Sequence, residues 1–113
     1  MKLLWLFLLT LIAQSDPGIM VGDAAYYHDK FHGRPTASGE PYDKDAWTAA
    51  HRTLPFGTRL RVTRLDTGQS VEVRVNDRGP HSPERLIDLS RRAAEELDIV
   101  RAGVVRVEIQ IID

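Results

Sequence analysis

The stretch RLRVTRLDTGQSVEVRVN, residues 59–76, decides the fold class. Apolar and polar residues alternate over 59–65 and again over 70–76, where Val71, Val73 and Val75 share one face. Because the side chains of a strand point alternately to opposite faces, this period of two predicts two half-buried antiparallel strands. The intervening segment, residues 66–69, is short and contains a glycine, as hairpin loops do.

The rest of the chain extends this β pattern. Further strands are predicted over 21–27, 46–51, 86–89 and 104–112. Ser90 is suited to cap a helix of two turns over 91–97, in which Ala93, Ala94 and Leu97 share a face. We therefore expect a mainly β protein of about six short strands and one helix, closed into a small barrel that buries every apolar face and leaves no sheet edge.

The N-terminal segment differs from the rest in composition. Lys2 is followed by an uncharged apolar run to Ala13, and Ala13 and Ser15 place small residues at the −3 and −1 positions of a cleavage site. The run is shorter than the roughly 20 residues of a membrane-spanning helix and fits a secretory signal. We expect a signal peptide over 1–15, a leader over 16–21 and one domain over 22–113, with an uncleaved anchor as the alternative.

Composition excludes several classes of site. The 113 residues carry a formal net charge of −1, which disfavours a nucleic acid or an anionic membrane as partner. The sequence has no cysteine, which excludes disulfides, zinc-thiolate sites, a cysteine nucleophile and a lipid-modified N-terminal cysteine. His28, Asp29 and His32 have the spacing of helical metal ligands, but Gly33 and Pro35 make the segment a loop. No metal and no cofactor are predicted.

Three residues form a candidate acid/base set. Asp77 follows the valine-faced strand directly, so its carboxyl is held rigidly and is suited to general acid chemistry, or it forms an Asx turn with nearby backbone N–H groups. Glu40 lies in the turn-rich stretch 28–45, which is long enough to indicate a functional loop. His51 ends the predicted strand 46–51. Two carboxyl groups at one site tend to separate their pKa values, but spacing alone does not bring these residues together.

Six ordered segments resemble the RlpA-like (rare lipoprotein A) family of double-psi β-barrels. They are AYY (25–27), FHGR (31–34), TASGE (36–40), TAAHRTLPFGT (48–58), VNDRGP (75–80) and IDLS (87–90). The resemblance implies a six-stranded double-psi β-barrel with a glycan-binding groove. It also implies a lytic transglycosylase that cleaves the bond from N-acetylmuramic acid to N-acetylglucosamine in peptidoglycan, preferring strands without stem peptides. The muramic 6-hydroxyl attacks the anomeric carbon, and a 1,6-anhydro sugar forms without water.

The resemblance also implies roles for individual residues. Asp77 would protonate the leaving oxygen and then accept the proton of the attacking hydroxyl. Glu40 would stabilise the oxocarbenium-like charge or tune Asp77, and His51 would orient a carboxyl or bond the sugar. The acetamido and hydroxyl groups of the substrate would be held by Tyr27, Thr36, Asn76 and Arg78.

The chain also departs from the family pattern. His28 follows the tyrosine pair where a glycine is frequent, and His81 and Glu84 replace an aromatic residue and a glycine after the VNDRGP segment. Without a lipidated cysteine we expect a monomeric periplasmic or secreted protein with no stable membrane anchor after signal cleavage, acting on peptidoglycan glycan strands. The alternatives are a non-catalytic, expansin-like module that binds wall polysaccharide, a protein-interaction or inhibitor module, and a hydrolase that leaves reducing ends.

Overall fold

The computed structural model describes residues 18–113, so the predicted signal peptide lies outside the described part of the chain. It confirms a mainly β protein with one short α-helix. The elements are β1 (Ile19–Tyr26), the 3-10 helix η1 (Asp29–Phe31), β2 (Thr48–Ala50), β3 (Arg59–Arg64), β4 (Ser70–Asp77), β5 (Arg85–Leu89), α2 (Arg91–Glu96) and β6 (Val105–Ile111). β1 begins at Ile19, so residues 19–21 of the predicted leader are paired with β6.

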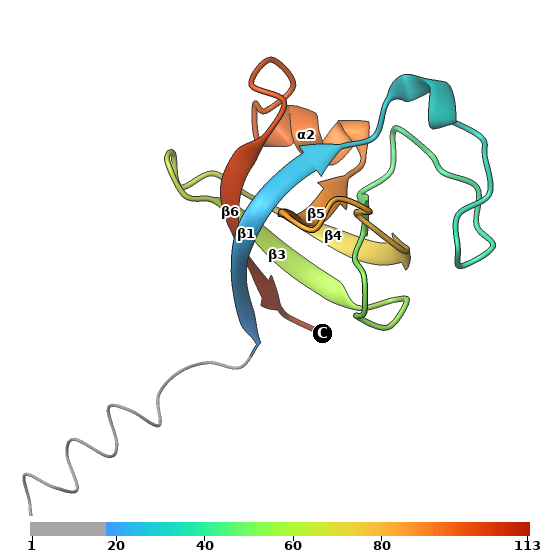
Figure 1. Cartoon of the computed structure of the whole chain (residues 1–113), viewed down its shortest axis with the longest axis horizontal. Coiled ribbons are helices and arrows are strands. Elements are labelled where there is room, and N and C mark those ends of the chain that lie inside the picture. Colours follow the sequence, from blue (N-terminus) through green and yellow to red (C-terminus); the bar gives the residue numbers. More distant parts are fainter. Residues whose placement is uncertain (1–17) are drawn as a thin grey trace, which may run out of the picture.

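The six strands close into a barrel in the order β1-β5-β2-β4-β3-β6 (Figure 1). β1 pairs with β5 in parallel and β2 pairs with β4 in parallel, whereas the other neighbours are antiparallel. The predicted hairpin is β3 and β4, with Leu60 opposite Val73 and Val62 opposite Val71. Because the barrel is closed, each of the six described strands has a hydrogen-bonded neighbour on both sides, as predicted.

The core follows from the alternation of side chains. Leu60, Val62 and Val75 are fully buried, and the inward residues of β6 join the same core. Ile111 is 38% exposed although it continues the apolar face of β6, because it is the last residue of that strand. Strand ends lie at the barrel rim, where a neighbour covers only part of the side chain.

The helix is capped as expected, although it is shorter than two full turns. The Ser90 hydroxyl accepts a hydrogen bond from the Ala93 N–H at 3.3 Å and donates to the Ala46 carbonyl at 2.6 Å. Ala93, Ala94 and Leu97 are completely buried, so this face of α2 packs against the barrel. No helix within residues 18–113 is long and apolar enough to cross a membrane.

The long loop after β1 leaves the barrel and returns to it, as Figure 1 shows at one side of the molecule. It carries η1 and folds back on itself through a bridge between Pro35 and Pro41. The tight turn 36–40 is closed by the Thr36 N–H, which donates to the Glu40 carbonyl at 2.8 Å. The Ser38 N–H then donates to the Asn76 carbonyl at 3.2 Å, which fixes this turn against the end of β4.

Candidate active site

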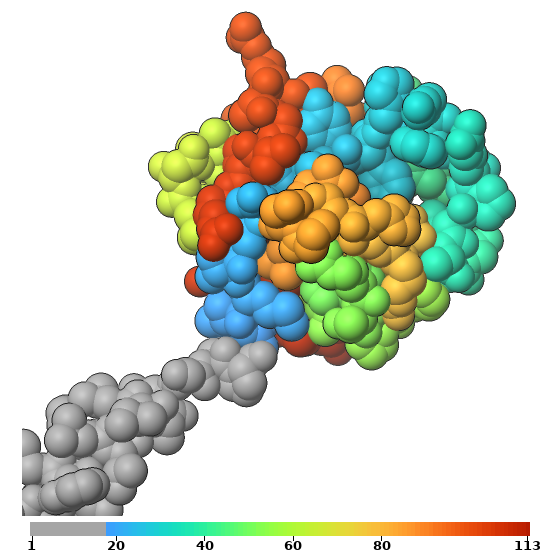
Figure 2. Space-filling view, viewed as in Figure 1, coloured from blue at the N-terminus to red at the C-terminus, as the bar shows by residue number. Residues whose placement is uncertain are grey.

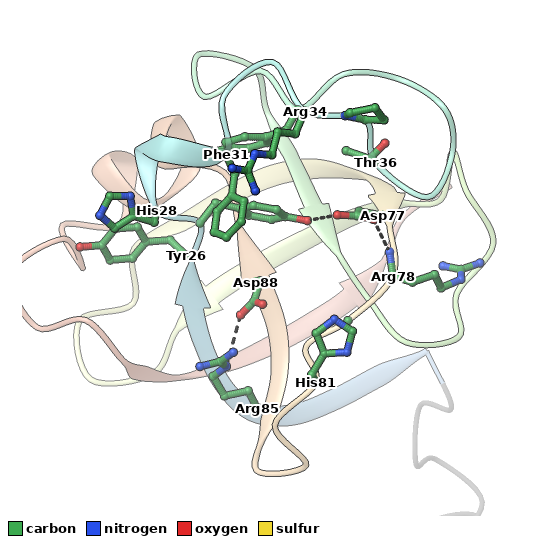
Figure 3. Close-up of a pocket in the computed structure, with 14 residues that line it drawn as sticks. Tyr26, His28, Phe31, Arg34, Thr36, Asp77, Arg78, His81, Arg85 and Asp88 are labelled. Atoms are coloured by element: carbon green, nitrogen blue, oxygen red, sulfur yellow. Dashed lines mark hydrogen bonds and ion pairs between the residues drawn. The ribbon is translucent and has the colours of Figure 1, made fainter.

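A pocket of about 580 Å³ lies between the long loop and the segment that joins β4 to β5. The space-filling view shows the loop standing beside this segment with a hollow between them (Figure 2). Among the residues that line the pocket are Tyr27, Thr36, Asp77, Arg78, His81 and Asp88. Three parts of the chain that are distant in sequence therefore meet there, and the close-up shows their side chains converging (Figure 3).

The Asp77 carboxyl is the most strongly held group in this pocket. Its Oδ1 accepts hydrogen bonds from the backbone N–H groups of Ala37 and Arg78, each at 2.8 Å. Its Oδ2 accepts a hydrogen bond from the Tyr27 hydroxyl. The bond from Arg78 comes from the next residue in the chain, whereas the other two donors come from distant segments. Three donors on two oxygens suit a carboxylate.

Tyr27 is fixed for this contact by packing. Its ring stacks on Tyr42 with centroids 4.3 Å apart and an interplanar angle of 16°. Burial raises the pKa of the Tyr27 hydroxyl well above its ordinary value, and the Asp77 carboxylate raises it further. The raised pKa favours the protonated phenol, which donates its hydrogen to Asp77.

A second carboxyl, Asp88, lines the same pocket and was not among the predicted site residues. Its Oδ1 lies 3.3 Å from Arg85 Nε, and both atoms are shielded from solvent without a well-aligned hydrogen bond. Burial raises the pKa of Asp88, while the positive charges of Arg85 and His81 lower it and Asp77 raises it. The sequence signal that could have identified Asp88 was a carboxylate inside the apolar stretch 86–89.

The two carboxyl-bearing residues flank one residue of β2. Ala50 pairs with Asp77 on β4 and with Asp88 on β5. Two strand spacings place their Cα atoms roughly 9–10 Å apart. Ala50, which separates them, has only a methyl side chain and is itself buried.

His51 lies behind this pocket and does not line it. Its side chain is buried, and Nδ1 accepts hydrogen bonds from the N–H groups of Thr53 and Leu54, both at 3.1 Å. The backbone N–H of His51 donates to the backbone carbonyl of Asp77 at 3.1 Å, and Arg78 Nη1 donates to the His51 carbonyl at 3.2 Å. Burial lowers the pKa of His51, and the charges of Arg52 and Arg78 lower it further. The geometry fits a neutral residue that positions the segment bearing Asp77.

Glu40 also lies outside the pocket of Asp77. Its carboxylate forms a two-pronged ion pair with Arg74, at 2.6 and 3.2 Å. This contact holds the pKa of Glu40 below its ordinary value. Glu40 instead lines a neighbouring depression together with Arg74 and Asn76. The structure connects Glu40 to Asp77 indirectly, through Arg74 on β4 and through the turn 36–40, whose backbone supplies the Ala37 donor.

The four predicted substrate-binding residues are divided between the pocket of Asp77 and the depression of Glu40. Tyr27, Thr36 and Arg78 line the pocket of Asp77, whereas Asn76 is buried and belongs to the depression of Glu40. Arg78 is partly committed to the protein, because Nη1 donates to the Leu54 carbonyl at 2.8 Å. Its guanidinium lies 4.0 Å from the centre of the Phe56 ring, which is 43% exposed.

The histidines of the long loop have structural contacts. His28 Nδ1 accepts a hydrogen bond from the Lys30 N–H at 3.0 Å, and His32 Nδ1 accepts one from the Lys44 N–H at 3.1 Å. Within residues 18–113, no group of three or more His, Asp or Glu side chains is arranged to hold a metal ion.

Comparison with known proteins places this geometry in a family. A family model described as Lytic transglycolase matches residues 19–109. The chain is 54% identical over 99 residues to a probable endolytic peptidoglycan transglycosylase RlpA of Treponema pallidum, covering 88% of this chain and 31% of that protein. It is 54% identical over 94 residues to the endolytic peptidoglycan transglycosylase RlpA of Pseudomonas aeruginosa, covering 83% and 28%. The chain thus spans about a third of the length of these relatives.

Solved structures share the barrel. The Streptomyces papain inhibitor superposes with a TM-score of 0.69 at 26% identity, covering 86% of this chain and 96% of that one. A Clavibacter michiganensis expansin variant in complex with cellohexaose superposes with a TM-score of 0.67 at 21% identity, covering 84% and 50%. The expansin likeness shows the fold alone and confirms the double-psi β-barrel. From the family model and from both close relatives, the chain belongs to the lytic transglycolase family of RlpA-like double-psi β-barrels.

Proposed function

We propose that this chain is a lytic transglycosylase of peptidoglycan that cleaves the bond from N-acetylmuramic acid to N-acetylglucosamine and leaves a 1,6-anhydro end. The single observation that carries the proposal is the Asp77 carboxyl, held by three donors from three segments in an open pocket. A module that only binds sugar does not need a carboxylate positioned this way. The names of the RlpA relatives support the same reaction.

The reaction develops positive charge at the anomeric carbon as the glycosidic bond breaks. An ionised Asp77 fixed below that carbon would stabilise this charge without reorganising, because its donors already hold it in place. Tyr27 and the Ala37 N–H would serve the reaction by orienting Asp77. Thr36 and Arg78, which line the same pocket, would hold the acetamido and hydroxyl groups of the sugar.

Glu40 and His51 support this site from outside the pocket in our proposal. The ion pair of Glu40 with Arg74 would stabilise the turn that presents the Ala37 N–H. His51 would hold the backbone on which Asp77 and Arg78 are placed. Both are positioning residues in this mechanism, and their replacement should act through the geometry of Asp77.

A peptidoglycan substrate would require a location in the cell envelope. We propose that residues 1–15 direct export and are cleaved, and that the barrel domain acts in the periplasm or outside the cell as a monomer on glycan strands. The absence of cysteine from the sequence is consistent with a protein that is not lipid-anchored through that residue.

The test compares the purified chain with its Asp77→Asn variant on intact and on peptide-stripped peptidoglycan. Soluble products are identified by mass spectrometry. We expect anhydro-ended fragments from the unmodified chain alone, with the stripped glycan as the better substrate. Fragments with hydrated reducing ends would indicate a hydrolase. Retention of both proteins on stripped glycan without any product would indicate a binding module.

A further inference from the structure

The two carboxyl groups of the pocket have contrasting surroundings. Asp77 accepts hydrogen bonds on both oxygens from three donors. Asp88 has one close charged neighbour, Arg85, at 3.3 Å from Oδ1, and that contact is not a well-aligned hydrogen bond. In the close-up the Asp88 carboxyl points into the pocket between Asp77 and Arg85 (Figure 3). Asp77 thus has hydrogen-bond donors on both oxygens, whereas Asp88 lacks such donors.

We propose that Asp88 is a further catalytic residue and supplies the proton that the leaving glycosidic oxygen receives. Asp77 is then the carboxylate that faces the reacting carbon, in place of the proton-transfer role that the family resemblance implies for it. This inference rests on the proposed transglycosylase function and names the proton donor of that same site. Asp88 meets the geometric requirement, because it lines the same pocket as Asp77 and flanks the same residue of β2.

The charged groups around Asp88 come from several elements. Arg85 lies on β5 itself, His81 lies on the segment before it, Arg52 follows β2 and Asp77 ends β4. The three basic groups favour the charged form of Asp88, whereas burial and Asp77 favour the neutral form and prevail. Because the pKa of Asp88 is raised, its protonated fraction persists to a higher pH than that of an ordinary aspartic acid.

Each proton and bond in the step is accounted for. The bond between C1 of N-acetylmuramic acid and the glycosidic oxygen breaks, and that oxygen takes the proton of Asp88. The muramic O6 forms a new bond to the same C1, and its hydroxyl proton passes to the Asp88 carboxylate. Asp88 ends the cycle protonated, so no water, oxidant or further reactant is consumed. Asp77 stays ionised throughout and stabilises the charge on C1.

The experiment uses two substrates that differ only in the leaving group. One is a peptide-stripped glycan strand, whose leaving sugar oxygen needs a proton. The other is a glycan oligosaccharide ending in N-acetylmuramic acid with 4-methylumbelliferone at C1, a phenolic group that leaves without one. The Asp88→Asn and Asp77→Asn variants are compared with the unmodified chain. Asp66→Asn is the matched control, because Asp66 lies in the exposed β3–β4 loop and is 63% exposed.

We expect Asp88→Asn to lower kcat/KM on the natural strand by about 10²–10⁴-fold and to change it on the phenolic substrate by less than about tenfold. Asp77→Asn should lower kcat/KM on both substrates. Retention of the natural rate by Asp88→Asn, or an equal loss on both substrates by a folded variant, would overturn the assignment of Asp88 alone. If the unmodified chain forms no anhydro product from either substrate, the proposed function fails and the inference fails with it.

A second variant keeps the inference testable if Asp88→Asn does not fold. Arg85→Gln removes the cation nearest to Asp88, so the pKa of Asp88 should rise further. A general acid loses activity as pH rises through its pKa, because the donor is then deprotonated. The alkaline limb of kcat/KM should therefore move to higher pH in Arg85→Gln and stay in place in Asp66→Asn. An unmoved limb would argue against Asp88 as the donor.

Discussion

Replacement of His51 by alanine distinguishes a positioning role from a chemical one. His51 is 4% exposed, and its Nδ1 accepts hydrogen bonds from the N–H groups of Thr53 and Leu54. Each such bond contributes about 1 kcal/mol net, and removing the buried ring adds a packing loss. Thr53 is exposed, so water can reach one of the freed N–H groups. We expect a loss of about 2–3 kcal/mol in the free energy of unfolding.

The loss is large relative to the stability of a small domain, which is about 5–15 kcal/mol. Urea denaturation followed by circular dichroism should show a lower midpoint with an unchanged slope. In a thermal scan, the melting temperature should fall by roughly 8–24 °C. His51→Asn is the matched control, because the Asn Oδ1 can accept the same backbone hydrogen bonds. His51→Asn should retain most of the free energy of unfolding that is lost in His51→Ala. It should also retain most of the cleavage activity at low temperature.

The pH dependence gives an independent check on His51. Its folded pKa lies below the ordinary value of 6.5, so between these two values the unfolded chain binds a proton that the folded chain does not. Stability should therefore fall as pH is lowered below about 6.5, and His51→Asn should remove this part of the dependence. A folded His51→Asn variant without activity would refute the positioning role and support direct chemistry by the imidazole.

Three further substitutions test the site and the barrel. Tyr27→Phe removes the hydroxyl that donates to the carboxylate at the end of β4, so kcat should fall by about 10–100-fold in steady-state assays while the melting temperature changes little. Glu40→Gln and Arg74→Gln break one exposed ion pair, so each should cost at most about 1 kcal/mol in urea denaturation and the double variant should cost no more than the worse single one. Gly22→Ala would place a Cβ 2.6 Å from Leu86 Cβ and should destabilise the barrel by about 1–3 kcal/mol, which urea denaturation would show as a lower midpoint.

The strands were predictable because their signal is local. The alternation over 59–76 specifies which side chains face inward, and the observed hairpin pairs Leu60 with Val73 as that pattern requires. The parallel pairings of β1 with β5 and of β2 with β4 join segments that are far apart in sequence. Periodicity contains no information about such partners, so only the family resemblance indicated a double-psi barrel, and the strand order comes from the structure.

The site was predictable in part for the same reason. Asp77 is a carboxylate at the end of a clear strand, and the pocket contains it. The set of Asp77, Glu40 and His51 was proposed from residue types, but the structure places Glu40 against Arg74 and buries His51 behind the pocket. Asp88 was overlooked as a site residue because its neighbours Ile87 and Leu89 are core residues, and their apolar stretch obscured the one side chain that faces the pocket.

An irregularity in strand pairing explains how the two carboxyls come to share a pocket. Strict alternation along β4 would place Asp77 on the same face as Val73 and Val75, inside the core. The register with β2 shifts, however, because Ala49 pairs with Val75 whereas Ala50 pairs with Asp77. Asn76 is thus the extra residue of a bulge, and a bulge redirects the side chain that follows it.

This shift aligns Asp77 with Ala50, whose other partner is Asp88 on β5. Residues opposite one another on neighbouring strands present their side chains to the same face, so the bulge brings both carboxyls to one side of the barrel wall. The chemistry we propose therefore depends on the residue before Asp77 as much as on Asp77. Without this shift in register, residues 75–77 would alternate strictly against β2, and Asp77 would lie on the valine face, away from Asp88.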